Sequence, residues 1–330
     1  MNNIDFPYKK YFMNKKSYYY DNIINFKPHY VKAVKYYLDG ITKYFFDVII
    51  GYDSKVYDEI DIFTDYFTED QRVKALVKYE KSTPYDWYKT HEKEIDEMFK
   101  DVKGIKNKIY EKREYVYQNV KEATQFKISC ILSIMKYVEN DKHINISKLK
   151  VLDPSSGWGD RLIGFMGLNV NEYIGYDPNK NLQKGYKNII SSFKRLKVST
   201  KANVICDGFE NMKKEHINHF DIVFTSPPYF DVETYDNDNK QSIKKYNKFE
   251  LWRDKFFSIY IKNCVDAVKK GGLIFIHISN NREFKIVDYL MNEMKKYNVR
   301  KYKYFGIMGA SGKCMPIWSW IKKWKIYLLN

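Results

Sequence analysis

From about residue 148 onward, short apolar runs alternate with longer amphipathic stretches. The short runs suit β-strands and the longer stretches suit α-helices, so the pattern predicts repeated βαβ units. Such units form a parallel sheet covered by helices on both faces, and we therefore expect an α/β sandwich. The last two strands, joined by the segment GASGKCMP, are expected to form a terminal β-hairpin. The expected strands are Lys150–Leu152, Glu172–Tyr176, Asn203–Cys206, Asp221–Thr225, Leu273–Ile278, Tyr302–Ile307 and Ile317–Tyr327, and the expected helices are Arg161–Gly167, Asn181–Leu196, Phe249–Lys269 and Glu283–Tyr297.

The preceding part of the chain has a helical pattern instead. Helices are predicted over Lys27–Val48, over Glu69–Lys81 and along a charged stretch, Asp86–Val120, that is interrupted at Gly104. Another helix, Thr124–Asn140, carries a broad apolar stripe. The pattern divides the chain into a helical N-terminal extension, residues 1–120, and an α/β domain, residues 121–330.

A glycine-containing turn, VLDPSSGWG, joins the first predicted strand of the α/β domain to its first helix. Gly157 and Gly159 allow the backbone to turn tightly and to approach a ligand, because they lack a Cβ. Asp153 stands at the strand end, where its carboxylate can meet a cationic group. The spacing D-P-x-x-G-x-G differs from the G-x-G-x-x-G of dinucleotide-binding loops. The turn therefore predicts a site for an amine or ammonium ligand rather than a phosphate.

Two further acids follow the next two predicted strands. Asp177, in IGYDP, stands where doubly wound sheets place an acid that accepts ribose hydroxyls. Asp207, in ICDGF, is suited to accept an adenine amino group. Ligands of open α/β sheets bind outside the carboxyl ends of the strands, so Asp153, Asp177 and Asp207 are expected to converge on one crevice.

The fourth predicted strand ends in the segment FTSPPYF, whose two prolines predict a rigid extended turn. Such a turn suits the methylation of an aromatic amine, whose nitrogen is a poor nucleophile because its lone pair is delocalised into the ring. The Ser226 hydroxyl and the Pro227 carbonyl are suited to accept the amino hydrogens and to draw the nitrogen toward tetrahedral geometry. Tyr229 is expected to stack on a base flipped out of its helix.

The pair DPSSGWG and SPPY resembles the motifs of the amino-methyltransferase family, which modifies adenine N6 or cytosine N4 in DNA. The family's first motif is typically D-P-F-x-G-S-G, and its second is D/N/S-P-P-Y/F. In the first motif, Ser155 replaces the usual Phe and Trp158 the usual Ser. The residues that match are Asp153, Pro154, Gly157 and Gly159 in the first motif, and Ser226, Pro227, Pro228 and Tyr229 in the second.

The resemblance covers about residues 120–330 and implies a Rossmann-like, seven-stranded methyltransferase sheet with a C-terminal β-hairpin. It also implies a helix beside the methionine end of the cofactor, for which Ala123–Ile134 is the counterpart. The longer segments GWGDRLIG and TSPPYFDVETY look like those of methyltransferase-type proteins of phages and large viruses. The implied cofactor is S-adenosylmethionine, bound by Asp153, Pro154, Ser155, Gly157, Gly159, Asp177 and Asp207, and the implied catalytic residues are Ser226, Pro227, Pro228 and Tyr229.

The expected substrate is nucleic acid, and DNA before RNA. Ser at position 226 is seen more often in the cytosine-N4 enzymes of this family, which favours cytosine N4 slightly over adenine N6. RNA base methylation and glutamine methylation in a protein are alternatives, although Asn is expected at this position for guanine and for glutamine. A methyltransferase fold retained as a non-catalytic nucleic-acid-binding subunit is another alternative, against which the intact motifs argue.

Only about seventy residues separate the two motifs, which leaves no room between them for a large target-recognition domain. Recognition of a target sequence is therefore expected from residues 1–120, from the polar loop Asp231–Asn247 or from a partner, or else it is absent. That loop either orders on substrate or is a plain surface loop.

The net charge of +16 and the pI of about 9.3 are consistent with a polyanionic partner. Only seven of the 57 basic residues are Arg, and the heavy use of Lys, Asn, Ile and Tyr suggests an AT-rich coding genome. Charge alone therefore leaves nucleic-acid binding open. The cations are nevertheless concentrated, since residues 301–330 hold six Lys and no acid.

Cysteine and histidine usage predicts neither disulfides nor a metal site. The four Cys lack a C-x-x-C pair, and the H-x-x-H formed by His216 and His219 has no acid or Cys at ligand spacing. Every apolar run is soon interrupted by polar residues, and the start of the chain lacks the features of a secretory signal. The expectation is a soluble intracellular protein without a membrane span, of unspecified oligomeric state.

Overall fold

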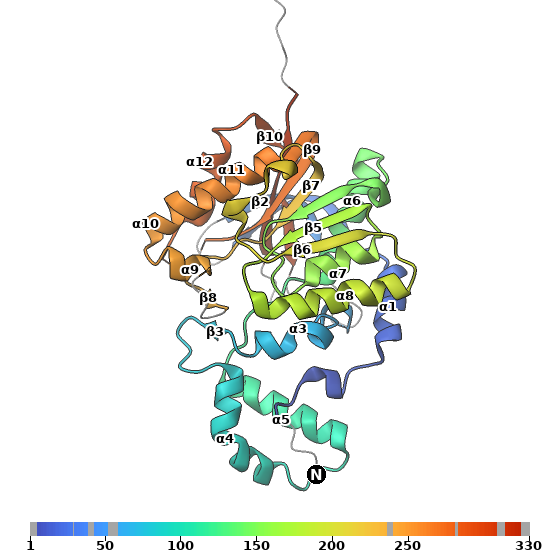
Figure 1. The fold of residues 1–330 in the computed structure, drawn as a ribbon, viewed down its shortest axis with the longest axis vertical. Helices are drawn as coiled ribbons and strands as arrows, with labels where there is room; N and C mark the ends of the chain where they lie inside the picture. Colours follow the sequence, from blue (N-terminus) through green and yellow to red (C-terminus); the bar gives the residue numbers. More distant parts are fainter. Residues whose placement is uncertain are drawn as a thin grey trace, which may run out of the picture.

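The computed structural model describes residues 5–28, 30–38, 43–51, 59–235, 240–280, 283–308 and 314–324. A mixed β-sheet forms its centre, and helices pack on both faces of the sheet (Figure 1). The strands are β1 (Tyr30–Leu38), β2 (Lys43–Ile50), β3 (Leu76–Val77), β4 (Lys150–Asp153), β5 (Glu172–Tyr176), β6 (Lys201–Ile205), β7 (Phe220–Thr225), β8 (Glu233–Thr234), β9 (Val268–His277), β10 (Val299–Lys301), β11 (Phe305–Met308) and β12 (Cys314–Lys322). The helices are α1 (Lys16–Ile24), α3 (Asp65–Arg72), α4 (Pro84–Met98), α5 (Ile105–Asn119), α6 (Ile128–Lys142), α7 (Asp160–Gly167), α8 (Gln183–Arg195), α9 (Ser242–Lys245), α10 (Phe249–Leu251), α11 (Ser258–Ala267) and α12 (Ile286–Met294).

Seven strands of the main sheet run in the order β6-β5-β4-β7-β9-β12-β11. The first five of them are parallel, and β12 is antiparallel to both of its neighbours, β9 and β11. The prediction of a Rossmann-like sheet with a C-terminal β-hairpin is therefore confirmed, and β1, β2 and β10 extend these seven strands to ten among the described residues. The hairpin is β11–β12; the residues 309–313 between them and the end of the predicted last strand, residues 325–330, lie outside the described residues.

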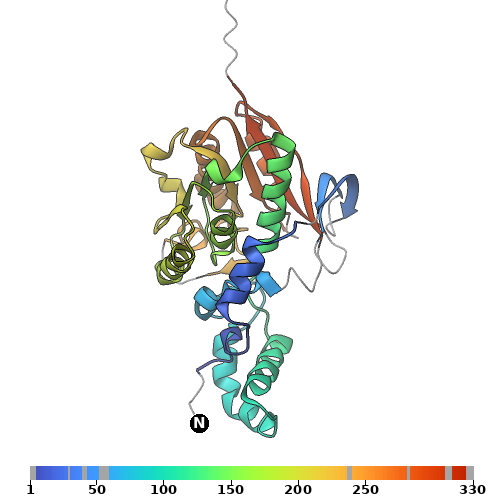
Figure 2. The same cartoon turned by 90° about the vertical axis from the view of Figure 1, so that its right-hand side faces the viewer.

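The helix predicted over Lys27–Val48 is wrong, because β1 and β2 occupy this segment and pair antiparallel. Strand β2 also pairs parallel with β11, so the main sheet grows by two strands at this edge. Figure 2 shows β1 and β2, in blue, beside the red strands of the C-terminal hairpin. Val48, Ile49 and Ile50 are all buried there, as suits β-branched residues in a covered strand.

Other N-terminal predictions agree with the structure more closely. The charged stretch forms α4 and α5, which break at Gly104 with its φ of +83°, and these helices make a lobe below the sheet (Figures 1 and 2). The apolar stripe after residue 124 forms α6. In place of the helix predicted over Glu69–Lys81, α3 ends at Arg72 and the short strand β3 pairs with β8.

Two apolar cores lie on the two faces of the main sheet. One contains the buried faces of α6, α7 and α8, and the other contains those of α11 and α12. The parallel register aligns the carboxyl ends of β4, β5, β7 and β9, since Asp153 pairs with Gly175 and Thr225 with Ile276. The segments that follow these strands therefore meet at the same end of the sheet.

The division of the chain at residue 120 stays a prediction, although β1 and β2 show that part of residues 1–120 belongs to the main sheet. Within the described ranges, none of the helices has the length and apolar character required to cross a membrane.

Candidate active site

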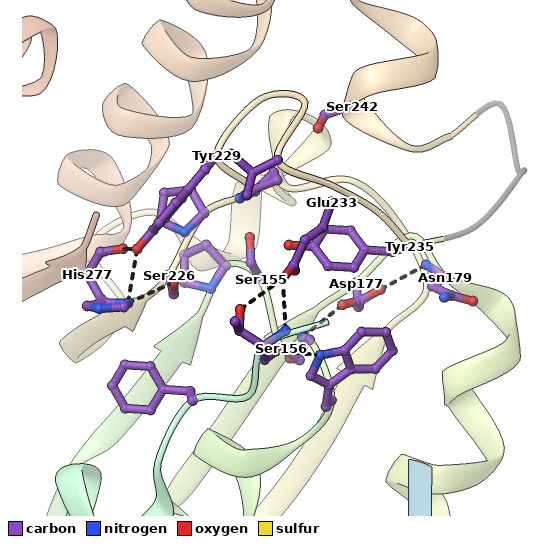
Figure 3. A pocket seen from close by; sticks show the side chains of 18 of the residues that line it. Ser155, Ser156, Asp177, Asn179, Ser226, Tyr229, Glu233, Tyr235, Ser242 and His277 are labelled. Carbon is purple, nitrogen blue, oxygen red and sulfur yellow. Dashed lines mark hydrogen bonds between the residues drawn. The ribbon is translucent and has the colours of Figure 1, made fainter. Parts of the chain in front are cut away.

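A pocket of about 510 Å³ opens at the carboxyl ends of the parallel strands (Figure 3). Both motifs face this pocket, although about seventy residues separate them in sequence. The predicted site residues that line it are Pro154, Ser155, Gly157, Asp177, Ser226, Pro227, Pro228 and Tyr229. The predicted site residues Asp153, Gly159 and Asp207 are not part of its lining.

The glycine-containing turn after β4 is held by a hydrogen bond from its backbone to the Asp177 side chain. Gly157 has a φ of +55°, and its N–H donates to Asp177 Oδ2 at 2.9 Å. Gly159 has a φ of +99°, and a Cβ placed on it would lie 2.8 Å from Ile189 Cδ1. Gly157 thus shapes the pocket wall, whereas Gly159 allows α7 to start close against α8.

Asp153 lies beneath the pocket lining, and its role toward a ligand stays a prediction. Its carboxylate is fully buried and accepts hydrogen bonds from Arg161 Nε at 2.9 Å and from the Tyr173 hydroxyl at 2.8 Å. Burial raises the pKa of the Asp153 carboxyl, and Arg161 opposes that shift. Arg161 in turn donates to the carbonyl of Ser155. Asp153 therefore positions the turn through Arg161.

Asp177 lies at the pocket wall, as predicted. Its Oδ1 accepts the Asn179 N–H at 2.9 Å, and its Oδ2 accepts the Gly157 N–H. Burial raises the pKa of the Asp177 carboxyl to about 6. Each carboxylate oxygen can accept a second hydrogen bond, which leaves acceptor capacity for a hydroxyl group in the pocket.

The Asp207 carboxylate forms hydrogen bonds with the loop that follows it. Its Oδ1 accepts hydrogen bonds from the Gly208 N–H at 2.8 Å and from Asn211 Nδ2 at 3.1 Å. The three residues that follow, Gly208, Phe209 and Glu210, line the pocket in its place.

The turn after β7 is tied to the end of β9 by one histidine. Ser226 Oγ lies 3.2 Å from His277 Nδ1, and the Tyr229 hydroxyl lies 3.1 Å from the same nitrogen and donates to the His277 carbonyl at 3.2 Å. Figure 3 shows the three side chains grouped at one end of the pocket. Phe230, with a φ of +63°, then turns the chain away.

His277 was missed in the sequence, because it sits in an apolar strand without a motif around it. Burial lowers the pKa of its imidazole to about 3, and the charge of Arg161 acts in the same direction. The ring is therefore neutral at neutral pH. The hydroxyls of Ser226 and Tyr229 both lie within hydrogen-bond distance of Nδ1.

The pocket is covered by the loop after β7 and by the segment before α6. Glu233 Oε1 accepts hydrogen bonds from Thr124 N at 2.8 Å and from Thr124 Oγ1 at 3.0 Å. Trp158 Nε1 donates to the Thr124 carbonyl at 2.9 Å, and the Trp158 ring packs edge-on against Tyr235 at 5.7 Å. The first part of the loop Asp231–Asn247 therefore packs over the pocket rather than lying free in solvent, whereas residues 236–239 lie outside the described residues.

A buried ionic network links α3 to the same segment. Arg72 forms ion pairs with Asp65, at 2.5 Å, and with Glu122. Gln125 Nε2 donates to Asp65 Oδ1 at 3.0 Å, and both Glu122 and Gln125 line the pocket. Helix α3 thus fixes the segment that the family resemblance placed beside the cofactor.

A π-helical turn, Trp252–Phe257, lies between α10 and α11 and brings aromatic side chains to the pocket. Phe256 and Tyr260 line the pocket, and the Tyr260 hydroxyl lies 2.8 Å from Ser155 Oγ. Ser155 stands where the resembling family has Phe, so here a hydrogen bond replaces an apolar contact. Wide turns of this kind are frequent at functional sites.

Residues 220–307 match the model of a family described as DNA methylase. This match includes the SPPY turn and His277 but not the glycine-containing turn, and it covers less than half of the chain. No curated protein sequence matches the chain.

Several solved structures are similar to part of this chain. An rRNA methylase from Streptococcus thermophilus is 12% identical over 58% of this chain and 96% of that chain, with a TM-score of 0.39. An S-adenosylmethionine-dependent methyltransferase from Corynebacterium glutamicum is 14% identical over 56% and 85%, with a TM-score of 0.37. A tRNA methyltransferase from M. jannaschii is 15% identical over 61% and 52%, also with a TM-score of 0.37. With TM-scores below 0.5, these likenesses do not bear on the function of the chain.

Proposed function

We propose that this chain transfers a methyl group from S-adenosylmethionine to an exocyclic amino nitrogen of a DNA base, either cytosine N4 or adenine N6. The observation that carries the proposal is that the SPPY turn and the DPSSGWG turn line one pocket at the carboxyl ends of the parallel strands. The match of residues 220–307 to DNA methylases supports it independently.

The pocket fits the proposed cofactor. Its volume of about 510 Å³ lies in the range typical of sites for ligands of this size. Asp177 has acceptor capacity for ribose hydroxyls, and Gly157 leaves open space, since a Cβ there would approach only the Ser155 carbonyl, at 3.9 Å. The Phe209 ring offers an apolar surface for adenine. With Asp153 paired to Arg161, Glu233 is our choice of acid for the ammonium group.

S-adenosylmethionine, when bound, supplies the methyl group on a positively charged sulfur. The residues of this chain then have to hold the target nitrogen with its lone pair directed at that methyl group. The Ser226 oxygen and the Pro227 carbonyl accept the two amino hydrogens, which withdraws the lone pair from the ring of the base.

His277 makes Ser226 an effective acceptor. When the Ser226 hydroxyl donates its proton to the neutral Nδ1 of His277, its lone pairs are free for the target amine. A protonated imidazole would instead donate to Ser226 and compete with the amine. The low pKa of His277 therefore suits the proposed reaction.

Tyr229 is proposed to stack on the flipped base. Its hydroxyl is held by His277, which restricts rotation of the side chain and leaves the ring beside Ser226. An aromatic side chain that is already restricted loses less entropy when a base stacks against it. Cytosine N4 is slightly favoured over adenine N6, because Ser226 occupies the first position of the motif.

The test is methyl transfer from tritiated S-adenosylmethionine to duplex DNA, single-stranded DNA, total RNA and a protein extract in separate reactions. Label in DNA with the wild type, and none with Tyr229→Ala, is the expected result. The exposed variant Tyr79→Ala serves as the matched control and is expected to keep full activity. Label confined to RNA or protein would overturn the substrate, and no label with no cofactor binding would favour the non-catalytic subunit.

A further inference from the structure

A second pocket, of about 770 Å³, lies at the opposite end of the main sheet, where the parallel strands begin. It forms where β7 and β9 begin and where β12 ends, and it is called the basic pocket below. Figure 1 shows β10 at this end of the sheet and β8 at the opposite end. Strand β9 begins at the second pocket and ends at the candidate active site, and its ten residues span about 30 Å. The basic pocket is therefore separate from the candidate active site.

Cations dominate the lining of the basic pocket, and one acid, Asp221, stands against them. The basic residues are Lys142, Lys269, Lys270, Arg300, Lys322 and Lys323.

Two of these cations have structural partners. Lys269 forms an ion pair with Asp221 at 2.7 Å. Lys322 Nζ donates to the carbonyls of Val265, at 2.7 Å, and Val268, at 2.8 Å. These two lysines therefore stabilise the rim of the pocket through contacts within the protein.

Three other cations are exposed and have no acidic partner within 4.0 Å among the described residues, namely Lys270, Arg300 and Lys323. They come from the start of β9, from β10 and from the residue after β12, so the tertiary fold brings them together. Unpaired cations gathered around a hollow attract a polyanion.

An exposed tryptophan completes the pocket. The Trp324 side chain is 68% exposed and lies against Gly271, where a Cβ would be 3.5 Å from Trp324 Nε1. Gly271, with a φ of +81°, thus lets one part of the ring rest on the backbone while most of it faces solvent. Such a ring beside free cations is suited to stack on a base.

We infer that the basic pocket binds a single-stranded segment of nucleic acid, with Lys270, Arg300 and Lys323 on its phosphates and Trp324 stacked on one of its bases. A single strand is favoured over a duplex, because stacking on Trp324 requires a base whose face is open. The inference goes beyond the proposed methylation, since binding at this edge of the sheet requires neither the cofactor nor the SPPY turn.

The experiment measures binding of a fluorescently labelled 20-nucleotide single-stranded DNA by anisotropy, without S-adenosylmethionine. The variant Lys270→Glu/Arg300→Glu/Lys323→Glu is expected to bind at least tenfold more weakly than the wild type. Loss of three phosphate contacts also predicts that the slope of log K against log salt becomes shallower by about 2. The matched control, Lys184→Glu/Lys187→Glu/Lys194→Glu on α8, makes the same change in net charge on exposed residues and is expected to retain most of the affinity.

Trp324→Ala tests stacking with little change in charge. We expect about tenfold weaker binding and loss of most of the quenching of intrinsic fluorescence that DNA produces in the wild type. Thymidine 5′-monophosphate, added as a competitor, is expected to displace the oligonucleotide only at much higher concentration. Displacement at equal concentration would mark a mononucleotide site and contradict the inference.

Unchanged affinity and salt slope in the triple variant, or an equal loss in the α8 control, would overturn the inference. A protein that binds through the basic pocket but labels no nucleic acid would refute the proposed function alone.

Discussion

Ser226 and His277, which are 51 residues apart in sequence, meet at the ends of two adjacent parallel strands, with 3.2 Å between Ser226 Oγ and His277 Nδ1. Strands β7 and β9 pair in register, so that Thr225 lies opposite Ile276 and the next residues lie opposite each other. A neutral histidine is thereby held against the first residue of the SPPY turn.

Replacing His277 tests this arrangement. In His277→Ala the Ser226 hydroxyl loses its acceptor, and we expect kcat to fall about tenfold, as is typical for loss of one hydrogen bond. The Kd for the cofactor is expected to stay unchanged. His277→Asn, which keeps an acceptor oxygen, is expected to recover part of kcat, and His91→Ala on α4 serves as a remote control. An unaltered kcat in His277→Ala would contradict the role of this residue.

The two substitutions Tyr229→Phe and Tyr229→Ala separate the hydroxyl from the ring. Tyr229→Phe removes the contacts with His277 but keeps the stacking surface, so a loss of a few-fold in kcat/KM is expected. Tyr229→Ala removes both and is expected to abolish transfer, as is Ser226→Ala, with cofactor binding nearly intact. Steady-state kinetics and calorimetry measure the two effects. Equal activity of the alanine and phenylalanine variants would argue against stacking on Tyr229.

Binding of the cofactor is expected to weaken in acid because of Asp177. Its pKa is about 6, and the charged carboxylate is the better acceptor for ribose hydroxyls. The Kd is therefore expected to rise as the pH falls from 7 to 5, by up to about tenfold per unit below pH 6. Asp177→Asn should bind weakly with little dependence on pH, whereas Asp101→Asn should behave as the wild type does. A wild-type Kd that is constant from pH 5 to 8 would exclude this role.

The pH dependence of stability is expected to depend on Asp160. An unfolded Asp titrates near 3.9, whereas burial raises the pKa of Asp160 to about 7 in the folded chain. The native state thus holds this proton more tightly, and its contribution is present in acid and is lost as the pH rises through 7. Between pH 5 and pH 8 the loss of unfolding free energy from this group is about 3 kcal/mol.

Urea denaturation of Asp160→Asn tests that expectation. The amide oxygen can still accept the hydrogen bond that Thr64 Oγ1 donates to Asp160 at 2.5 Å, so the variant should fold. Its unfolding free energy should vary less between pH 5 and pH 8 than that of the wild type. The same pH dependence in both proteins would show that Asp160 does not titrate in this range.

Removing Arg72 is expected to destabilise both the fold and the cofactor site. In Arg72→Met the buried Asp65 loses its closest partner and Glu122 loses an ion pair, which typically costs about 3 kcal/mol or more. The segment that carries Glu122 and Gln125 along the pocket should also loosen and weaken cofactor binding. Denaturation and calorimetry are the measurements, with the exposed Arg195→Met as control. A change below about 0.5 kcal/mol would place Arg72 among ordinary surface residues.

The core of the fold was readable from the sequence because local periodicity and strand order agree there. Each of the parallel strands β4, β5, β6, β7 and β9 follows a helix or turn with its own signal, and parallel βαβ units leave few topologies. Strands β1 and β2 were not readable, because their place depends on pairing between β2 and the distant β11. Local apolar spacing over Lys27–Val48 fitted a helix equally well, and tertiary pairing decided the outcome.

The candidate site was predictable where a backbone feature needs a particular residue. The turns at Gly157 and at the two prolines were found for that reason, and Asp177 was found by its place after β5. The pairing of Asp153 with Arg161, the second residue of α7, could not be predicted from the sequence, because it depends on the fold. His277 was missed, since its function depends on the alignment of β9 with β7.

The central claim is tested most directly by identifying the methylated nucleoside. DNA incubated with the protein and S-adenosylmethionine would be digested to nucleosides and analysed by mass spectrometry beside a Ser226→Ala control. We expect N4-methyldeoxycytidine or N6-methyldeoxyadenosine with the wild type and neither with the variant. Methylation at cytosine C5, or DNA without any methylated nucleoside, would contradict it.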